Sequence, residues 1–95
     1  MSAILEHAVA RLSQKIAKFD GVIKFSIIDE GEILLDQKGV RIEGGPSQAT
    51  LTASADVFEK ILLSELNAMT AYMSDKLQIN GDMSVVMRLA RALSA

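Results

Sequence analysis

The sequence has no cysteine and a single histidine among its 95 residues. Without thiols the chain can form neither a disulfide framework nor a Cys/His zinc site of its own. One histidine also leaves few ways to pair a nucleophile with a general base, and His7 has no such partner in a recognisable catalytic setting. We therefore expect no metal, no cofactor and no enzyme activity, with His7 on the protein surface.

Long apolar runs and an excess of positive charge are also missing. No stretch approaches the roughly 20 apolar residues that span a bilayer, and the N-terminus lacks a basic region followed by an apolar one. Ten Lys and Arg against 12 Asp and Glu give a net charge of −2, which offers no basic field to a nucleic acid. The sequence predicts a soluble, cytoplasmic protein that binds no nucleic acid.

Aromatic residues are scarce, at 4% of the chain, although 49% of the residues are hydrophobic and five are methionines. The mean hydropathy is +0.26. A chain of this length suits a single domain, which we take as residues 1–95. The aliphatic surplus must then line a core, a cavity, an oligomer interface or a membrane-contact face, and composition leaves all of these open.

Hydrophobic periodicity divides the chain into helices and strands. The predicted elements are helices over 3–18, after Ser54, from Asn67 and after Asp82, and strands over 22–28, 33–35, 40–42, 48–52 and 76–80. Glycine turns between the first four strands predict an antiparallel meander. Two helices precede the last strand and allow a crossover, so this strand can join the sheet in parallel. The predicted fold class is α+β, with the order αββββααβα and helices on one face of a mostly antiparallel five-stranded sheet.

The segment from Ser64 to Met83 is the most informative, because a predicted short helix, a strand and the start of a further helix follow one another with very short connections. This segment is similar to the signature of the sterol carrier protein (sterol-transfer) family, and a looser resemblance runs from about Gly21 to Leu93. The matching positions are Leu66, Ala71, Lys76, Leu77, Ile79, Gly81 and Asp82, with Tyr72 in the aromatic place. Departures occur at Ser64, Ala68 and Asp75, where Gly, Pro and Gly are commoner. The resemblance implies a sheet whose helices enclose a hydrophobic tunnel or cavity.

Apolar side chains around this segment are candidates for ligand binding. Such stripes are usually ordinary core, but methionine adapts to irregular contacts, which suits a site that accepts several lipid shapes. With the resemblance, this predicts a lipid cavity lined by Phe58, Leu62, Met69, Tyr72, Met73, Leu77, Met83, Met87 and Ala90. The Tyr72 hydroxyl can meet a ligand head group or simply reach the surface. Lys76 and Arg88 can attract a carboxylate or phosphate, or can be solvated charges.

Two functions fit these observations. The first is a soluble lipid-binding or lipid-transfer protein whose ligand, as the resemblance implies, is a sterol, a fatty acid, a fatty acyl-CoA or a phospholipid acyl chain, with transient membrane contact during transfer. The second is a non-catalytic assembly module whose apolar helical face mediates homodimerisation or docking to a partner enzyme. The chain ends two residues after Leu93, so a missing helical cover would leave this face for a second copy.

Overall fold

The structure, a computed structural model, describes residues 3–94. Helices and strands follow one another in the predicted order αββββααβα. The elements are α1 (Ala3–Lys15), β1 (Ile23–Ile27), β2 (Gly31–Asp36), β3 (Gly39–Ile42), β4 (Ala49–Ala53), α2 (Ala55–Leu62), α3 (Ala68–Met73), β5 (Gln78–Gly81) and α4 (Met83–Ser94). None of these helices is long and apolar enough to cross a membrane.

The strands form one sheet in the order β3-β2-β1-β4-β5. β1 is antiparallel to β2 and parallel to β4, with Ile23 opposite Ala49 and Ile27 opposite Ala53. The predicted antiparallel meander is therefore wrong at its fourth strand. The parallel pairing expected for β5 is also wrong, because β5 runs antiparallel to β4.

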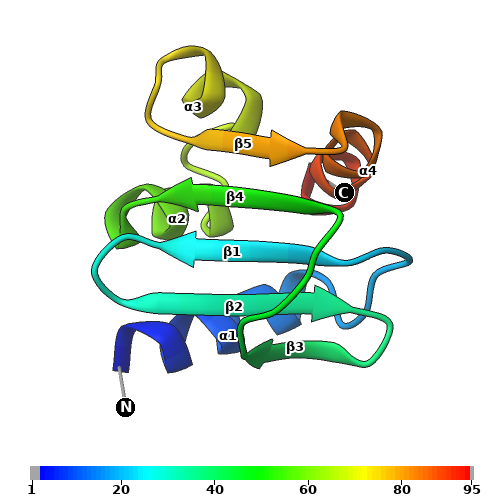
Figure 1. Ribbon diagram of the computed structural model, residues 1–95. Coiled ribbons are helices and arrows are strands. Elements are labelled where there is room, and N and C mark those ends of the chain that lie inside the picture. The colour runs from blue at the N-terminus through cyan, green and yellow to red at the C-terminus, as the bar shows by residue number, and fades with distance from the viewer. Residues whose placement is uncertain (1–2, 95) are drawn as a thin grey trace.

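The link between β3 and β4, residues 43–48, explains the direction of β4. Its Gly44-Gly45-Pro46 run has the composition of a tight turn, but the link crosses the sheet on the face opposite α1 and α2 (Figure 1). The Lys24 ammonium of β1 donates to the Gly45 carbonyl oxygen at 3.3 Å on that face. A link that crosses the sheet returns the chain to the end at which β1 starts, so β4 runs in the same direction as β1.

The hydrophobic core lies between the inner face of the sheet and the helices. Strand alternation turns Ile23, Phe25 and Ile27 inward and leaves Lys24 and Ser26 on the other face. The helices contribute the buried side chains of Leu5, Leu12, Phe58, Ile61, Leu62, Ala71, Val85, Val86 and Leu89. The face of the sheet that carries the apolar side chains is thus the face that the helices cover.

Three side chains cap the later helices at the predicted places. The Ser54 hydroxyl accepts from the Val57 N–H at 3.3 Å, and the Asn67 side-chain oxygen accepts from the Met69 N–H at 2.8 Å. The Asp82 carboxylate accepts from the backbone N–H and the hydroxyl of Ser84, and these bonds lower its pKa. Because an uncapped helix start leaves N–H groups without partners, these residues determine where α2, α3 and α4 begin.

Ser64 and Asp75 adopt left-handed backbone conformations, each with φ of 62°. Both stand where glycine is commoner in the signature that the sequence resembles, and each follows the end of a helix. A residue with a Cβ pays about 1–2 kcal/mol for this conformation, less for aspartate. The departures from the signature therefore leave the loop geometry in place and add side chains to it.

Gly81 lets β5 approach β4 closely, and the sequence change that tests this is Gly81→Ala. Its φ is 110°, and a Cβ there would overlap the Gln48 carbonyl oxygen and lie 2.8 Å from the Ala49 Cα. Gly45→Ala is the matched control, because Gly45 has φ of 134° with no heavy atom within 4 Å. Both variants carry backbone strain, so we expect Gly81→Ala to lose about 1–3 kcal/mol more in chemical unfolding. Equal losses would contradict the close approach.

Asp36 and Arg41 join β2 to β3 through a two-point ion pair. The Arg41 Nη1 and Nη2 atoms donate to the two Asp36 carboxylate oxygens at 2.9 and 2.8 Å. These bonds, followed by the Lys38 N–H, lower the pKa of Asp36 from 3.8 to about 2.

Because the folded-state pKa of Asp36 is the lower one, the ion pair stabilises the fold above the ordinary pKa of 3.8, and its contribution disappears as pH falls through about 2. We expect the unfolding free energy of Asp36→Asn to depend less on pH across this window than that of the wild type. Denaturant titrations at a series of pH values measure the slope of the unfolding free energy against pH for both proteins. Identical slopes would show that this ion pair does not determine the acid sensitivity.

Candidate functional site

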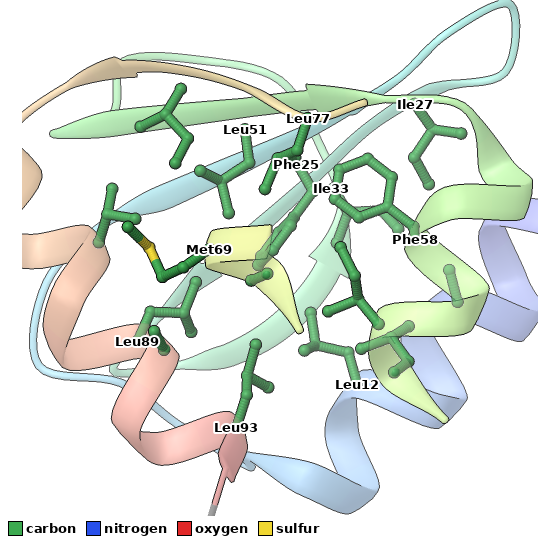
Figure 2. A pocket seen from close by; sticks show the side chains of 17 residues that line it. Leu12, Phe25, Ile27, Ile33, Leu51, Phe58, Met69, Leu77, Leu89 and Leu93 are labelled. Atoms are coloured by element: carbon green, nitrogen blue, oxygen red, sulfur yellow. The ribbon is translucent and has the colours of Figure 1, made fainter. Parts of the chain in front are cut away.

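A cavity of about 30 Å³ lies between the inner face of the sheet and the helices (Figure 2). Its lining consists only of apolar side chains. They are Ala8, Leu12, Phe25, Ile27, Ile33, Leu51, Phe58, Ile61, Leu62, Ala68, Met69, Leu77, Ile79, Val86, Leu89, Ala90 and Leu93. Every strand except β3 and all four helices contribute, so the cavity belongs to the tertiary fold rather than to one motif.

The sheet side of the cavity is rigid. Phe25, Ile33 and Leu51 project from three adjacent strands, where ladder hydrogen bonds fix the backbone. The Phe58 ring of α2 meets the Phe25 ring edge-on, with centroids 5.8 Å apart. This geometry is favourable for aromatic pairs and fixes α2 against the sheet.

The opposite side of the cavity is built from short or terminal elements. Met69 of α3 is half-buried, and its side chain lies between α3 and α4 (Figure 2). Leu93 projects from the last turn of α4 toward the cavity (Figure 2). Since α3 has only 6 residues and Leu93 is near a helix end, this wall is held by fewer backbone hydrogen bonds than the sheet.

Five of the predicted site residues line the cavity, namely Phe58, Leu62, Met69, Leu77 and Ala90. The other four are outside its lining, with exposed fractions of 38% for Tyr72, 81% for Met73, 38% for Met83 and 41% for Met87. The structure therefore corrects the predicted placement of these four side chains in the cavity wall.

The orientation of α4 about its own axis explains why Met83 and Met87 are outside the cavity lining. Its buried residues are Val85, Val86 and Leu89, whereas the sequence analysis placed Met83 and Met87 in the cavity lining. More than half of the helix circumference is apolar, so periodicity alone permits either orientation. The branched valines pack against the sheet, and the longer methionines face outward.

The short length of α3 explains why Tyr72 and Met73 are outside the cavity lining. Only Ala71 of this helix is fully buried, and Tyr72 and Met73 follow it on the outer side. A helix of 6 residues makes fewer than two turns, so one buried position determines its orientation. Sequence periodicity has too few residues here to identify that position.

The sequence analysis missed the contribution of the sheet and of α1. Phe25, Ile27 and Leu51 line the cavity from β1 and β4, and Ala8 and Leu12 line it from α1. Period-2 alternation identifies the strand residues as one apolar face. That signal could have found them, but it does not distinguish a cavity wall from close-packed core.

Two surface grooves adjoin the cavity. The α1/α2 groove, of about 500 Å³, shares Ala8, Ile27, Phe58 and Leu62 with the cavity. The α3/α4 groove, of about 260 Å³, lies between the α2–α3 link and α4 and is lined by Ile61, Ser64, Leu66, Asn67, Ala68, Ala90 and Leu93. The shared residues place each groove directly beside the cavity.

The polar groups of the α1/α2 groove already bind one another. The Arg11 Nε donates to the His7 Nε2 at 3.2 Å, and that nitrogen lies 3.7 Å from a Glu59 carboxylate oxygen. Arg88, a predicted head-group partner, instead donates to the Asp20 carbonyl oxygen at 2.9 Å and lies over the Phe19 ring. Lys76 is exposed.

The chemistry of the cavity is that of apolar side chains alone. Its lining, among residues 3–94, holds no titratable side chain, so it presents no acid, base or nucleophile to a bound molecule. Recognition there depends on apolar contact, which is non-directional and tolerates different shapes.

Solved structures of sterol carrier proteins have the same fold. The sterol carrier protein 2 of Aedes aegypti in complex with the C16 fatty acid palmitate matches 98% of this chain and 96% of its own, with TM-score 0.77 and 22% identity. Palmitated SCP2L2 from the same mosquito matches 100% and 96%, with TM-score 0.72 and 21% identity. The apo form of sterol carrier protein 2 from Yarrowia lipolytica matches 94% and 75%, with TM-score 0.66 and 20% identity.

None of the curated proteins matches the chain. The family model of the SCP-2 sterol transfer family matches residues 2–94, which is nearly the whole sequence. The similarity predicted from the 64–83 segment is confirmed, and this chain belongs to the SCP-2 sterol transfer family.

Proposed function

We propose that this protein binds one lipid chain at a time in its apolar cavity and carries it between donor and acceptor. The observation that carries the proposal is the lining of 17 apolar side chains contributed by both layers of the fold. Family membership supports a lipid-binding or transfer role, and two structural relatives are described with palmitate. Sterols, fatty acids, acyl-CoA esters and phospholipid acyl chains are the candidate ligands.

The cavity must widen to accept such a chain. Ligand pockets typically measure roughly 300–1,000 Å³, whereas this cavity has about 30 Å³. At about 24 cal/mol per Å³, a cavity of about 30 Å³ costs less than 1 kcal/mol, whereas opening it to roughly 300 Å³ without a ligand would cost about 7 kcal/mol. This is comparable to the whole stability of a small domain. We infer that the ligand and the open state form together.

Outward movement of α3 and the last turn of α4 is the smallest change that widens the cavity. It relocates Met69 and Leu93 and leaves the sheet and the Phe25–Phe58 contact intact. Burial of the lipid chain, at about 25 cal/mol per Å² of apolar surface, offsets the cost of opening. A lining without polar groups predicts broad selectivity for the chain itself.

A second candidate function is attachment to another surface through α3 and α4. The methionines Met73, Met83 and Met87 are exposed, and Met73 is the most exposed large hydrophobic residue of the described chain. An apolar surface of this kind suits a membrane during lipid release, a second copy of the chain or a partner enzyme. Membrane contact is compatible with lipid transfer, whereas a permanent dimer without ligand would be the assembly module.

Met69→Ala tests the cavity as a binding site. Loss of a half-buried side chain should cost about 2 kcal/mol in the absence of lipid. A bound chain fills the vacated space, so palmitate should raise the melting temperature of this variant by more than that of the wild type. Thermal denaturation with and without palmitate measures both effects. Met73→Ala is the matched control, since it removes the same type of side chain from an exposed position of α3. It should change neither the stability without lipid nor the rise in melting temperature that palmitate causes.

Native mass spectrometry of the purified protein, followed by organic extraction, tests the proposed function directly. A monomer carrying one lipid is the expected species. A ligand-free dimer that does not take up added palmitate would contradict lipid carriage and favour the assembly module.

A further inference from the structure

The α3/α4 groove and the cavity share four lining residues, Ile61, Ala68, Ala90 and Leu93. Ala68 and Ala90 contribute only methyl groups to this boundary, and Leu93 is in the last turn of α4. In Figure 2 the Leu93 side chain points into the cavity. A rotation of that side chain, with a small shift of the helix end, would join the groove to the cavity.

The boundary of the α1/α2 groove is bulkier. That groove and the cavity share Ala8, Ile27, Phe58 and Leu62 in their linings. The Phe58 ring cannot move without breaking its edge-on contact with Phe25 at 5.8 Å. Of the two grooves, the α3/α4 groove therefore requires the smaller rearrangement to admit a chain.

Polar groups occur at the outer side of the α3/α4 groove. Ser64 lines it, and the Lys15 ammonium from the end of α1 donates to the Ser64 hydroxyl at 2.6 Å. No carboxylate among residues 3–94 forms an ion pair with Lys15. The ammonium thus keeps its positive charge and two further N–H donors next to Ser64, at the edge of the groove.

The conformation of Ser64 adds a second observation at the same place. Its φ of 62° is one that glycine adopts freely and serine does not. The side chain nevertheless supplies the hydroxyl that Lys15 contacts. The turn itself is the common left-handed end of a helix, in which the Glu65 N–H donates to the Lys60 carbonyl oxygen at 2.8 Å.

From this geometry we propose that the α3/α4 groove binds the anionic head of a single-chain lipid, with the Lys15 ammonium and the Ser64 hydroxyl donating to its oxygens while the chain passes Leu93 into the cavity. The proposal rests on the proposed function and narrows its ligand class to chains with an anionic head, such as fatty acids. A carboxylate and a phosphate share the required chemistry, since both accept charge-assisted hydrogen bonds.

A comparison of palmitate with its methyl ester tests this proposal, because the two share one chain and differ in head charge. Dissociation constants are measured by displacement of a neutral apolar fluorophore, diphenylhexatriene, from the intact protein. The wild type should prefer palmitate. Lys15→Gln should weaken palmitate binding about tenfold and leave the ester unchanged, as expected for the loss of a charged hydrogen bond. Ser64→Ala should show a smaller loss in the same direction.

Two further variants serve as controls for Lys15→Gln. Lys18→Gln removes an exposed ammonium that lines a different surface pocket, with Phe19, Asp20 and Gln37, so it should bind both ligands as the wild type does. Arg11→Gln removes the guanidinium of the α1/α2 groove and should likewise leave both constants unchanged. Hexadecyl phosphate, titrated in parallel, distinguishes a phosphate-selective groove from a carboxylate-selective one.

The outcomes separate this proposal from the function on which it rests. A palmitate loss in Arg11→Gln instead of Lys15→Gln would place the head in the other groove and overturn the proposal. Equal wild-type affinity for acid and ester would also overturn it while leaving lipid binding intact. Failure of the wild type to bind either ligand would overturn both.

Discussion

The parallel pairing of β1 with β4 is the interaction on which the rest of the structure depends. It places Phe25 and Ile27 beside Leu51 and Ala53 at the centre of the sheet, where their side chains face the helices. The same pairing brings β4 to the position from which α2, α3 and then β5 follow. The link over residues 43–48 makes this pairing possible, because it carries the chain across the outer face of the sheet before β4 begins (Figure 1).

A rigid layer and an adjustable layer result from this topology. The sheet and α2 are held by ladder hydrogen bonds and by the contact between Phe25 and Phe58. The opposite wall consists of the short α3 and the end of α4, which contribute Met69 and Leu93 to the lining. The free-energy cost of a large apolar cavity favours the narrow arrangement, and in the proposed function a hydrocarbon ligand would reverse this preference because it would replace the lost contacts.

The polar residues of the 64–83 segment determine where this adjustable wall begins and ends. Asn67 and Asp82 cap the helices that follow them, and Ser64 and Asp75 hold left-handed turns despite their side chains. Gly81 brings β5 against the backbone of β4, where no larger residue fits. Each residue has a local role, yet together they fix the angle at which α3 and α4 close the cavity.

Local chemistry made much of this fold predictable. Alternation located the strands, and caps at Ser54, Asn67 and Asp82 located the helix starts, because these signals depend on neighbouring residues only. Cavity lining by Phe58, Leu62 and Met69 also agreed with their helical spacing. The pairing of β4 was not predictable in this way, since a glycine-rich link can form a hairpin or cross a sheet.

The sequence by itself determined the order of elements, their approximate limits and an apolar surplus that required burial. The tertiary structure decided which strands are neighbours, which side of α4 faces inward and therefore why Met83 and Met87 are exposed while Val85 and Leu89 are buried. The physical reason is that periodicity records how apolar a face is, whereas the partner that covers it is selected by packing between residues far apart in the chain.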